Sequence, residues 1–88
     1  MAWEVRIQPT AGKQIERLDR SVARRIVGHL EKLAENPYPS GIKKLAGEEN
    51  LFRARVGDWR IIYQVQDKLF LVLVIKVGHR KDVYRKLS

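Results

Sequence analysis

Apolar and polar residues alternate through residues 51–65, on both sides of the dipeptide Gly57-Asp58. Alternation with a period of two is typical of β-strands, and a glycine-aspartate pair between two such runs is typical of a hairpin turn. The pattern therefore predicts a hairpin in which Arg55 faces Arg60 across the two strands. One face of this hairpin is apolar and is predicted to be a core face; it carries Phe52, Ala54, Val56, Trp59, Ile61, Tyr63 and Val65.

The opposite face of the predicted hairpin carries Arg53, Arg55 and Arg60. Like charges that face each other across a strand pair destabilise it, so stability alone would not favour this arrangement. A bound polyanion would favour it, because guanidinium groups are planar, permanently charged donors suited to phosphate oxygens. A solvated basic surface is the better explanation for any one of these arginines alone. Three on one face, with Arg80 further along the chain, favour a phosphate-binding site.

The first half of the chain predicts one strand and two helices. Residues 3–7 alternate between apolar and polar and predict the strand. Pro9 suits the first turn of a helix, which we expect over roughly 9–20. Ser21 is predicted to cap a second helix, which ends before the turn-forming residues 36–41. The core face of this second helix follows spacings of three and four; it comprises Val22, Ala23, Ile26, Val27, Leu30, Leu33 and Ala34.

The second half of the chain predicts the remaining strands. Residues 42–50 form a polar connection into the hairpin, and Asp67-Lys68 predicts another tight turn after it. Residues 69–75 contain no polar side chain, which is typical of a central strand buried on both faces. The basic tail, residues 78–88, is predicted to form a turn and a short terminal helix.

This order of strand, two helices and three strands predicts an α+β domain. We expect a two-helix pair packed on one face of a mostly antiparallel sheet of about four strands, with a short C-terminal helix. The other face of the sheet would be left open, and the arginines of the hairpin would point to it. At 88 residues, the chain is predicted to be a single domain spanning 1–88.

Composition excludes several classes of protein. The chain has no cysteine, which rules out a disulfide framework and a cysteine-ligated zinc site. No apolar run approaches the ~20 residues of a membrane span. The first residues enter a strand-like pattern directly, so we expect no signal peptide and a cytoplasmic location.

The net charge of +8 is unevenly distributed. Residues 1–49 hold nine Lys/Arg and seven Asp/Glu, whereas residues 50–88 hold nine Lys/Arg and three Asp/Glu. A basic, sheet-forming half indicates a nucleic acid or an acidic partner protein. Composition alone leaves a solvated basic surface equally open.

Two segments of this chain resemble the RelE toxins of bacterial and archaeal toxin–antitoxin modules. They are residues 60–65 (RIIYQV) and residues 74–84 (VIKVGHRKDVY). Residues 36–37, residues 44–47 and the leading strand and helices also fit, so the resemblance covers nearly the whole chain. The first segment is shared across the wider RelE/ParE superfamily and is only moderately specific.

The second segment separates two branches of that superfamily. Relatives of the ParE type, which poison DNA gyrase, generally lack the basic residue and the tyrosine found here as Arg80 and Tyr84. The resemblance therefore implies an mRNA interferase, an endoribonuclease that enters the ribosomal A site and cuts the messenger RNA. In that family the ribose 2′-hydroxyl attacks the neighbouring phosphate. No metal and no cofactor are implied, which agrees with two isolated histidines and no carboxylate cluster.

The resemblance also implies the residues of the site. Arg53 and Arg55 match positions usually occupied by basic residues, Arg60 and Arg80 match the family's arginines, and Tyr84 matches its tyrosine. The best-known members carry lysines at the first two positions, and arginine, unlike lysine, effectively cannot act as a general base. We therefore expect the four arginines to hold the phosphate and stabilise transition-state charge. The tyrosine would stack on a base or donate to a phosphate.

The identity of the acid or base stays open. His79 is the obvious candidate because its unperturbed pKa is near neutrality. Strand alternation would place it on the face opposite to Arg80, unless Gly78 has already ended the strand. Lys81 and Arg85 are expected to contact RNA.

The implied partners are the ribosome with its messenger RNA and a RelB-like antitoxin. The antitoxin would be acidic, would form a toxin–antitoxin hetero-oligomer, and would contact the first two helices and the sheet edges. Two alternatives remain: a non-nuclease inhibitor of gyrase of the ParE type, and a plain basic RNA-binding module. The latter would show aromatic side chains between its basic residues, whereas Phe52, Trp59 and Tyr63 fall on the predicted core face.

Overall fold

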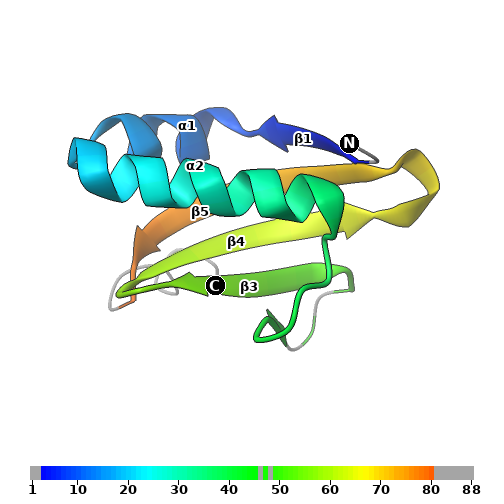
Figure 1. Cartoon of the computed structure of the whole chain (residues 1–88). Helices are drawn as coiled ribbons and strands as arrows, with labels where there is room; N and C mark the ends of the chain where they lie inside the picture. Colours follow the sequence, from blue (N-terminus) through cyan, green and yellow to red (C-terminus); the bar gives the residue numbers. More distant parts are fainter. Residues whose placement is uncertain (1–2, 46, 48, 81–88) are drawn as a thin grey trace.

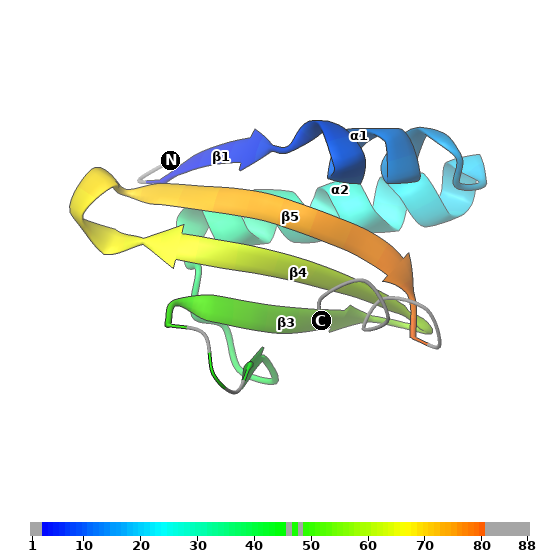
Figure 2. The same cartoon turned by 180° about the vertical axis from the view of Figure 1, so that it is seen from behind.

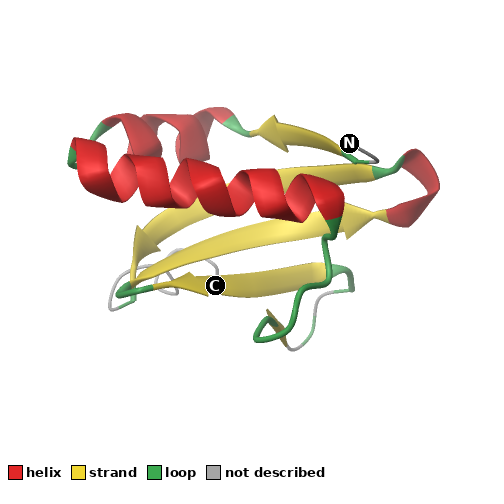
Figure 3. Cartoon of the chain, viewed as in Figure 1, coloured by secondary structure: helices red, strands yellow, loops and turns green. Residues whose placement is uncertain are grey.

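Two helices cover one face of a five-stranded sheet in the computed structural model of the chain, which describes residues 3–45, 47 and 49–80 (Figures 1 and 3). The elements follow in the order β1 (Glu4–Ile7), α1 (Pro9–Glu16), α2 (Arg20–Glu35), β2 (Lys43–Lys44), β3 (Leu51–Val56), β4 (Trp59–Gln66), a 3-10 turn (Asp67–Leu69) and β5 (Leu71–His79). The predicted α+β class is confirmed, while the predicted C-terminal helix lies outside the described residues. Within those residues, no helix has the length and apolar character needed to span a membrane.

The sheet has the strand order β1-β5-β4-β3-β2. β1 pairs with β5 in parallel and all other neighbours are antiparallel, as predicted for a mostly antiparallel sheet. The expected number of strands is wrong by one. Lys43 and Lys44, within the predicted polar connection, pair with Arg53 and Phe52 as β2. Such a short strand shows no alternating pattern, so local periodicity could not indicate it.

The second helix begins earlier than predicted. Asp19, and not Ser21, is the N-cap residue of α2, and its carbonyl accepts the N–H of Ala23 at 2.9 Å. Aspartate is as favourable as serine at this position, so the capping signal alone could not separate the two. α1 begins at Pro9 as predicted but ends at Glu16, short of the expected boundary.

The apolar face of α2 packs on the sheet and forms the core with it. Ile26 and Leu33 are completely buried and Leu30 is nearly so. Burial of each such side chain stabilises the fold by about 1.5–3 kcal/mol. Val27 was predicted to lie in the core as well, but it is exposed because it sits at the edge of the helix–sheet contact. The buried cluster consists of Ala11, Ile26, Leu30, Leu33, Ala54, Ile61, Tyr63, Val65, Val72, Val74 and Val77.

The hairpin of β3 and β4 has the predicted register, with Arg55 facing Arg60. Gly57 in the turn has a φ of +62°, a backbone conformation that favours glycine. On the core face, Tyr63 is fully buried and its hydroxyl donates a hydrogen bond to the carbonyl of Pro37 at 2.9 Å. This bond connects the end of the helical layer to the centre of the sheet.

The last strand begins later than predicted. Leu69 ends the 3-10 turn, and Phe70 adopts a left-handed conformation with a φ of +49°. Both side chains are exposed, so the prediction that residues 69–75 are buried on both faces is wrong for the first two. The Phe70 ring instead contacts Trp3, with 5.2 Å between the ring centroids. The turn takes up more residues than the Asp67-Lys68 pair, which delays the strand.

A β-bulge interrupts the pairing of β4 with β5. Tyr63 faces Val74, but its neighbour Ile62 faces Lys76. Ile75 is therefore an extra residue on β5. Bulges of this kind bend a strand and redirect the side chains that follow, and they are frequent next to active sites.

The bulge changes which side chains of β5 face the helices. Before it, Val72 and Val74 lie in the core, and after it Val77 does. In an uninterrupted strand Lys76 would continue the series of Val72 and Val74 and point at the helices. The extra residue places it on the opposite face, and alternation then places Gly78 there as well.

Candidate nucleic-acid interface

Cationic side chains gather on the sheet face opposite the helices, and we call this surface the arginine face. Neighbouring strands lie about 4.8 Å apart, so residues that face each other across them are direct neighbours. Figure 2 shows β3, β4 and β5 side by side from this side. Two rows of facing residues cross the three strands: Arg55, Arg60 and Gly78 form the first, and Arg53, Ile62 and Lys76 form the second.

The centre of the arginine face is buried, which contradicts the predicted open face. Arg60 is 7% exposed, Lys76 is 6% exposed and Ile62 is fully buried. Long cationic side chains cover apolar surface with their stems, and Ile62 lies between two of them in its row. Arg53 is half-buried, and Arg55 is exposed. Arg55 is therefore the hairpin arginine that is most accessible to a ligand.

Arg60 holds the hairpin turn through its guanidinium group. Its Nη1 donates to the carbonyl of Gly57 at 3.2 Å and to its own neighbour's carbonyl, that of Trp59, at 3.1 Å. Its Nε is buried and has no hydrogen-bond partner among the residues that the structure describes. The edge formed by Nε and Nη2 is the edge that binds an oxyanion in a bidentate manner. Arg60 therefore stabilises the turn, and a phosphate could reach its Nε only after the groups that cover it move aside.

Arg80 follows the end of β5 and joins it to the same turn. Its backbone N–H donates to the carbonyl of Asp58 at 2.9 Å, and its side chain is exposed. The prediction that Arg80 can lie beside Arg60 required β4 to pair with the buried strand. That pairing is present, and Arg60 faces Gly78, so Arg80 comes just beyond the first row.

Lys76 is a cation of the arginine face that the sequence pattern did not identify. In the sequence it is a single charge near the end of an apolar run, and simple alternation assigns it to the helix side. The structure places it in the second row, near Arg53 and Arg60, and almost completely buries it. Lysine differs from its arginine neighbours because its amine can lose a proton when its pKa is depressed.

His79 lies on the other side of the sheet from these cations. It faces Trp59, and the two rings meet edge-on with 5.6 Å between their centroids. Gly78 does not end the strand, because β5 continues through His79. His79 therefore lies on the helix side of the sheet, as alternation within β5 requires, and Arg80 follows after the strand has ended. Direct proton transfer by His79 at the arginine rows would have to occur from the opposite face.

Three predicted site residues, Tyr84, Lys81 and Arg85, lie outside the described residues. Within the described part of the chain, no group of three or more His, Asp or Glu side chains is arranged to hold a metal ion. His29, on α2, is half-buried. Burial, followed by the positive charge of Lys32, lowers the pKa of His29 below its usual 6.5. It belongs to the helical layer, on the other side of the sheet from the arginine rows.

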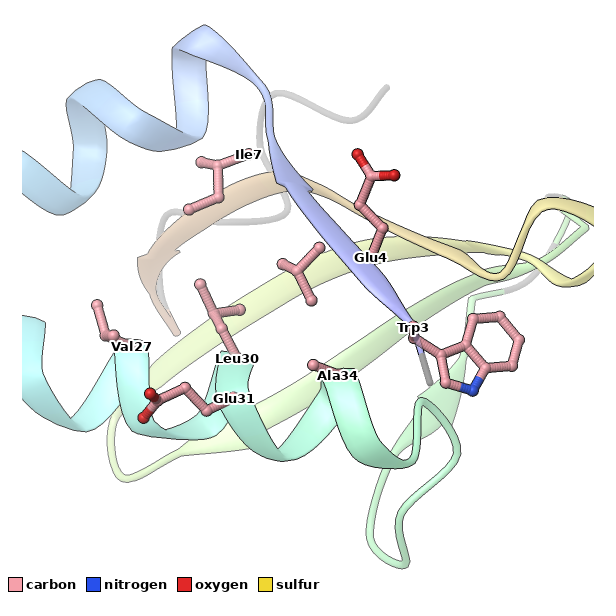
Figure 4. Close-up of a pocket in the computed structure, with 8 residues that line it drawn as sticks. Trp3, Glu4, Ile7, Val27, Leu30, Glu31 and Ala34 are labelled. Carbon is pink, nitrogen blue, oxygen red and sulfur yellow. The ribbon is translucent and has the colours of Figure 1, made fainter. Parts of the chain in front are cut away.

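A separate apolar groove runs between β1 and α2. It has a volume of about 410 Å³. Figure 4 shows Ile7 and Val27 at one end of the groove and Trp3 at the other. Ile7 and Val27 are each 45% exposed, which is high for large apolar side chains. Its mainly apolar lining suits a protein segment better than a phosphate; the lining consists of Trp3, Glu4, Val5, Ile7, Val27, Leu30, Glu31 and Ala34.

Comparison with known sequences identifies the family. Residues 5–84 match the family described as the ParE toxin of type II toxin–antitoxin system, parDE. A RelE-like toxin protein of Escherichia coli is 31% identical to this chain over 100% of the chain and 96% of the relative. The toxin RelG of Mycobacterium tuberculosis is 30% identical over 98% of the chain and 100% of the relative.

Solved structures show the same arrangement of helices and strands. The archaeal RelE–RelB complex from Pyrococcus horikoshii OT3 matches with a TM-score of 0.83 and 30% identity, over 94% of this chain and 100% of that one. The intact E. coli RelBE toxin–antitoxin complex matches with a TM-score of 0.79 and 26% identity, over 89% of this chain and 96% of that one. A two-helix layer on a basic sheet is thus the architecture of a toxin from a type II toxin–antitoxin module. The chain belongs to the RelE family of these toxins, within the RelE/ParE superfamily.

Proposed function

We propose that this toxin is a ribosome-dependent endoribonuclease that cleaves messenger RNA in the A site without a metal ion. The main support for this proposal is the arginine face, where Arg53, Arg55, Arg60 and Lys76 occupy two adjacent rows. Arg80 lies just beyond the first row, after the end of β5. Such a concentration of cations is unfavourable in a free protein and favourable around a phosphate. The RelE names of the relatives support the same activity.

The proposed reaction is an internal phosphoryl transfer. The 2′-oxygen of the ribose attacks the adjacent phosphorus and loses its proton, the bond from phosphorus to the 5′-oxygen breaks, and that oxygen takes up a proton. The products are a 2′,3′-cyclic phosphate end, which a water molecule can then open to a 3′-phosphate, and a 5′-hydroxyl end. Arg53, Arg55, Arg60 and Arg80 would stabilise the charge of the transition state, with each well-placed donor contributing about 3–4 kcal/mol.

The arginines do not supply a general base, because they stay protonated. Among the described cations of the face, Lys76 is the one whose amine can change protonation state. His79 remains a candidate from the other side of the sheet, and Tyr84 and the RNA-contacting roles of Lys81 and Arg85 remain predictions. Binding in the ribosome would supply much of the remaining acceleration by aligning the 2′-hydroxyl with the phosphate.

The proposed protein partner is a cognate RelB-like antitoxin. Relatives of this chain have been solved as RelE–RelB complexes. We expect the antitoxin to contact the first two helices and a sheet edge, and the exposed apolar lining of the groove between β1 and α2 supports this expectation. A net charge of +8 favours an acidic partner. Activity on ribosomes places the toxin in the cytoplasm, in a toxin–antitoxin hetero-oligomer when it is inhibited.

The proposal is tested by primer extension on a defined messenger RNA, incubated with the toxin in the presence and absence of programmed 70S ribosomes. Cuts within A-site codons that appear only with ribosomes are the expected result. Cuts on naked RNA would contradict ribosome dependence. An intact message in both samples would contradict the nuclease.

The ParE name of the matching family favours one second candidate, inhibition of DNA gyrase. A supercoiling assay with purified gyrase tests it separately. Loss of supercoiling together with intact message would establish the gyrase function.

A further inference from the structure

Arg25 of α2 lies directly over the turn of the β3–β4 hairpin. A Cβ atom added to Gly57 would be 2.8 Å from Nη2 of Arg25. Figure 1 shows the first half of α2 and the hairpin turn at the same end of the molecule. The helical layer therefore contributes a cation at the hairpin turn, to which Arg60 of the arginine face also hydrogen-bonds.

Three elements meet at this turn, and each brings an arginine. Arg25 approaches Gly57 from α2, Nη1 of Arg60 donates to the Gly57 carbonyl, and the backbone of Arg80 donates to the Asp58 carbonyl. The close approach of Arg25 depends on the missing side chain of Gly57. Arginines from three separate parts of the chain therefore lie at this one turn.

Arg25 is available to an external anion. Its side chain is exposed, and it forms no ion pair with any residue in the described ranges. Arg24 beside it is also exposed, but successive residues point about 100° apart around a helix. Arg25 adjoins the buried Ile26, on the side of the helix that turns towards the sheet. Arg24 and Arg25 carry the same charge on the same helix, so substitutions of the two residues can be compared directly.

We propose that Arg25 is a further RNA-binding residue of this toxin, which holds a phosphate next to the one bound by the arginine face. This inference rests on the proposed nuclease function. The RNA strand would pass around the hairpin turn, with one phosphate at Arg55 and Arg60 and a neighbouring phosphate at Arg25. Arg25 binds and positions the strand and takes no part in bond making or breaking.

The test compares Arg25→Gln with the matched control Arg24→Gln and with the rescue variant Arg25→Lys. Cleavage on programmed ribosomes gives kcat and KM. Binding of a short single-stranded RNA, methylated at every 2′-hydroxyl so that it cannot be cleaved, gives affinity as a function of salt. Thermal unfolding shows whether each variant keeps its fold.

For Arg25→Gln we expect KM to rise about tenfold with kcat nearly unchanged. The slope of log affinity for RNA against log salt concentration should become shallower by the amount that corresponds to about one phosphate contact. Arg24→Gln should change neither quantity, and Arg25→Lys should recover most of the affinity. Equal effects of the two glutamine variants would overturn the inference. A lower melting temperature of Arg25→Gln with unchanged KM and salt dependence would also overturn it. The same holds if Arg25→Gln weakens binding to the antitoxin but not to RNA.

Failure of the proposed function gives a different pattern of results. If the wild-type toxin cleaves nothing on ribosomes, the nuclease proposal fails while binding of the methylated RNA still tests Arg25. If the wild type cleaves but Arg25→Gln binds and cleaves normally, the nuclease stands and the role of Arg25 is refuted.

Discussion

Arg60 faces Gly78 across β4 and β5, and this pairing exists because Ile75 is an extra residue on β5. The bulge brings the end of the last strand to the arginine face and turns His79 away towards Trp59. The positions of Lys76 and Arg80 at this face therefore depend on one irregularity of the sheet, whereas the hairpin arginines do not depend on it. Several consequences can be measured.

Arg55→Gln should separate activity from stability. Arg55 is exposed and faces Arg60, so removing its charge relieves repulsion worth about 0.2–1 kcal/mol. We expect a slightly higher free energy of unfolding in urea together with about a hundredfold loss of cleavage on ribosomes. Arg17→Gln, on an exposed arginine after α1, is the matched control and should leave cleavage unchanged. Full activity of Arg55→Gln would remove Arg55 from the site.

Arg60→Gln should lower both stability and activity. The substitution removes both hydrogen bonds that hold the turn, at a cost of about 1–3 kcal/mol in urea unfolding. Cleavage should fall further than the folded fraction explains, because the Nε–Nη2 edge is lost as well. A variant whose activity loss simply follows its unfolded fraction would show that Arg60 is a structural residue.

Lys76 can be tested by comparing Lys76→Arg with Lys76→Met. If the face needs only a cation at this position, the arginine variant keeps its cleavage rate and the methionine variant loses about tenfold or more. If the amine transfers a proton, both variants lose activity, because arginine does not deprotonate. The control is Lys68→Met, which removes the same charge from an exposed lysine in the β4–β5 turn. Normal activity of both Lys76 variants would exclude the residue from the site.

Two buried or hydrogen-bonded tyrosine hydroxyls predict a loss of stability in alkali. Burial and then the charge of Tyr38 raise the pKa of Tyr63 well above its usual 10.0. Burial, the hydrogen bond to Asp67 and its charge raise the pKa of Tyr38 to about 12. Both groups keep their protons in the folded state at a pH where the unfolded chain loses them. Their stabilisation is complete below pH 10 and is lost as the pH rises through the folded-state values.

We therefore expect urea unfolding to show a decline in stability above about pH 10 that is smaller in Tyr63→Phe. At neutral pH, Tyr63→Phe should cost about 1–3 kcal/mol, because the buried carbonyl of Pro37 loses its donor. Tyr38→Phe, on an exposed ring, should cost less. An alkaline decline of equal size in Tyr63→Phe and the wild type would show that other groups cause it.

Val27→Asp should disrupt antitoxin binding and spare the nuclease. The side chain is exposed at the groove between β1 and α2, so the variant should fold normally. A carboxylate there would be repelled by an acidic partner and would lie in an apolar contact. We expect a large loss of affinity for the antitoxin by calorimetry, with unchanged cleavage on ribosomes. Val27→Ala serves as the control for size, and normal antitoxin binding by Val27→Asp would place the antitoxin elsewhere.

The register of the hairpin could be predicted because its information is local. Alternation over residues 51–65 and the turn at Gly57 together determine which side chains share a face. The same holds for the core face of α2, where Ile26, Leu30 and Leu33 recur at helical spacing. Both patterns can be read from one continuous segment of the chain, without knowing which other segments pack against it. The sequence was accordingly a good guide to the three hairpin arginines.

The composition of the arginine face beyond the hairpin was decided by the tertiary structure. The bulge inserts Ile75 as an extra, unpaired residue between β4 and β5, so alternation within β5 alone predicts the wrong face for Lys76. The burial of Arg60 likewise depends on neighbours from other strands and on the turn carbonyls that its guanidinium reaches. By itself the sequence determined the elements, the register of the hairpin and an excess of positive charge. Only the packed sheet determined which of those charges lie together, because their proximity depends on pairings between distant segments.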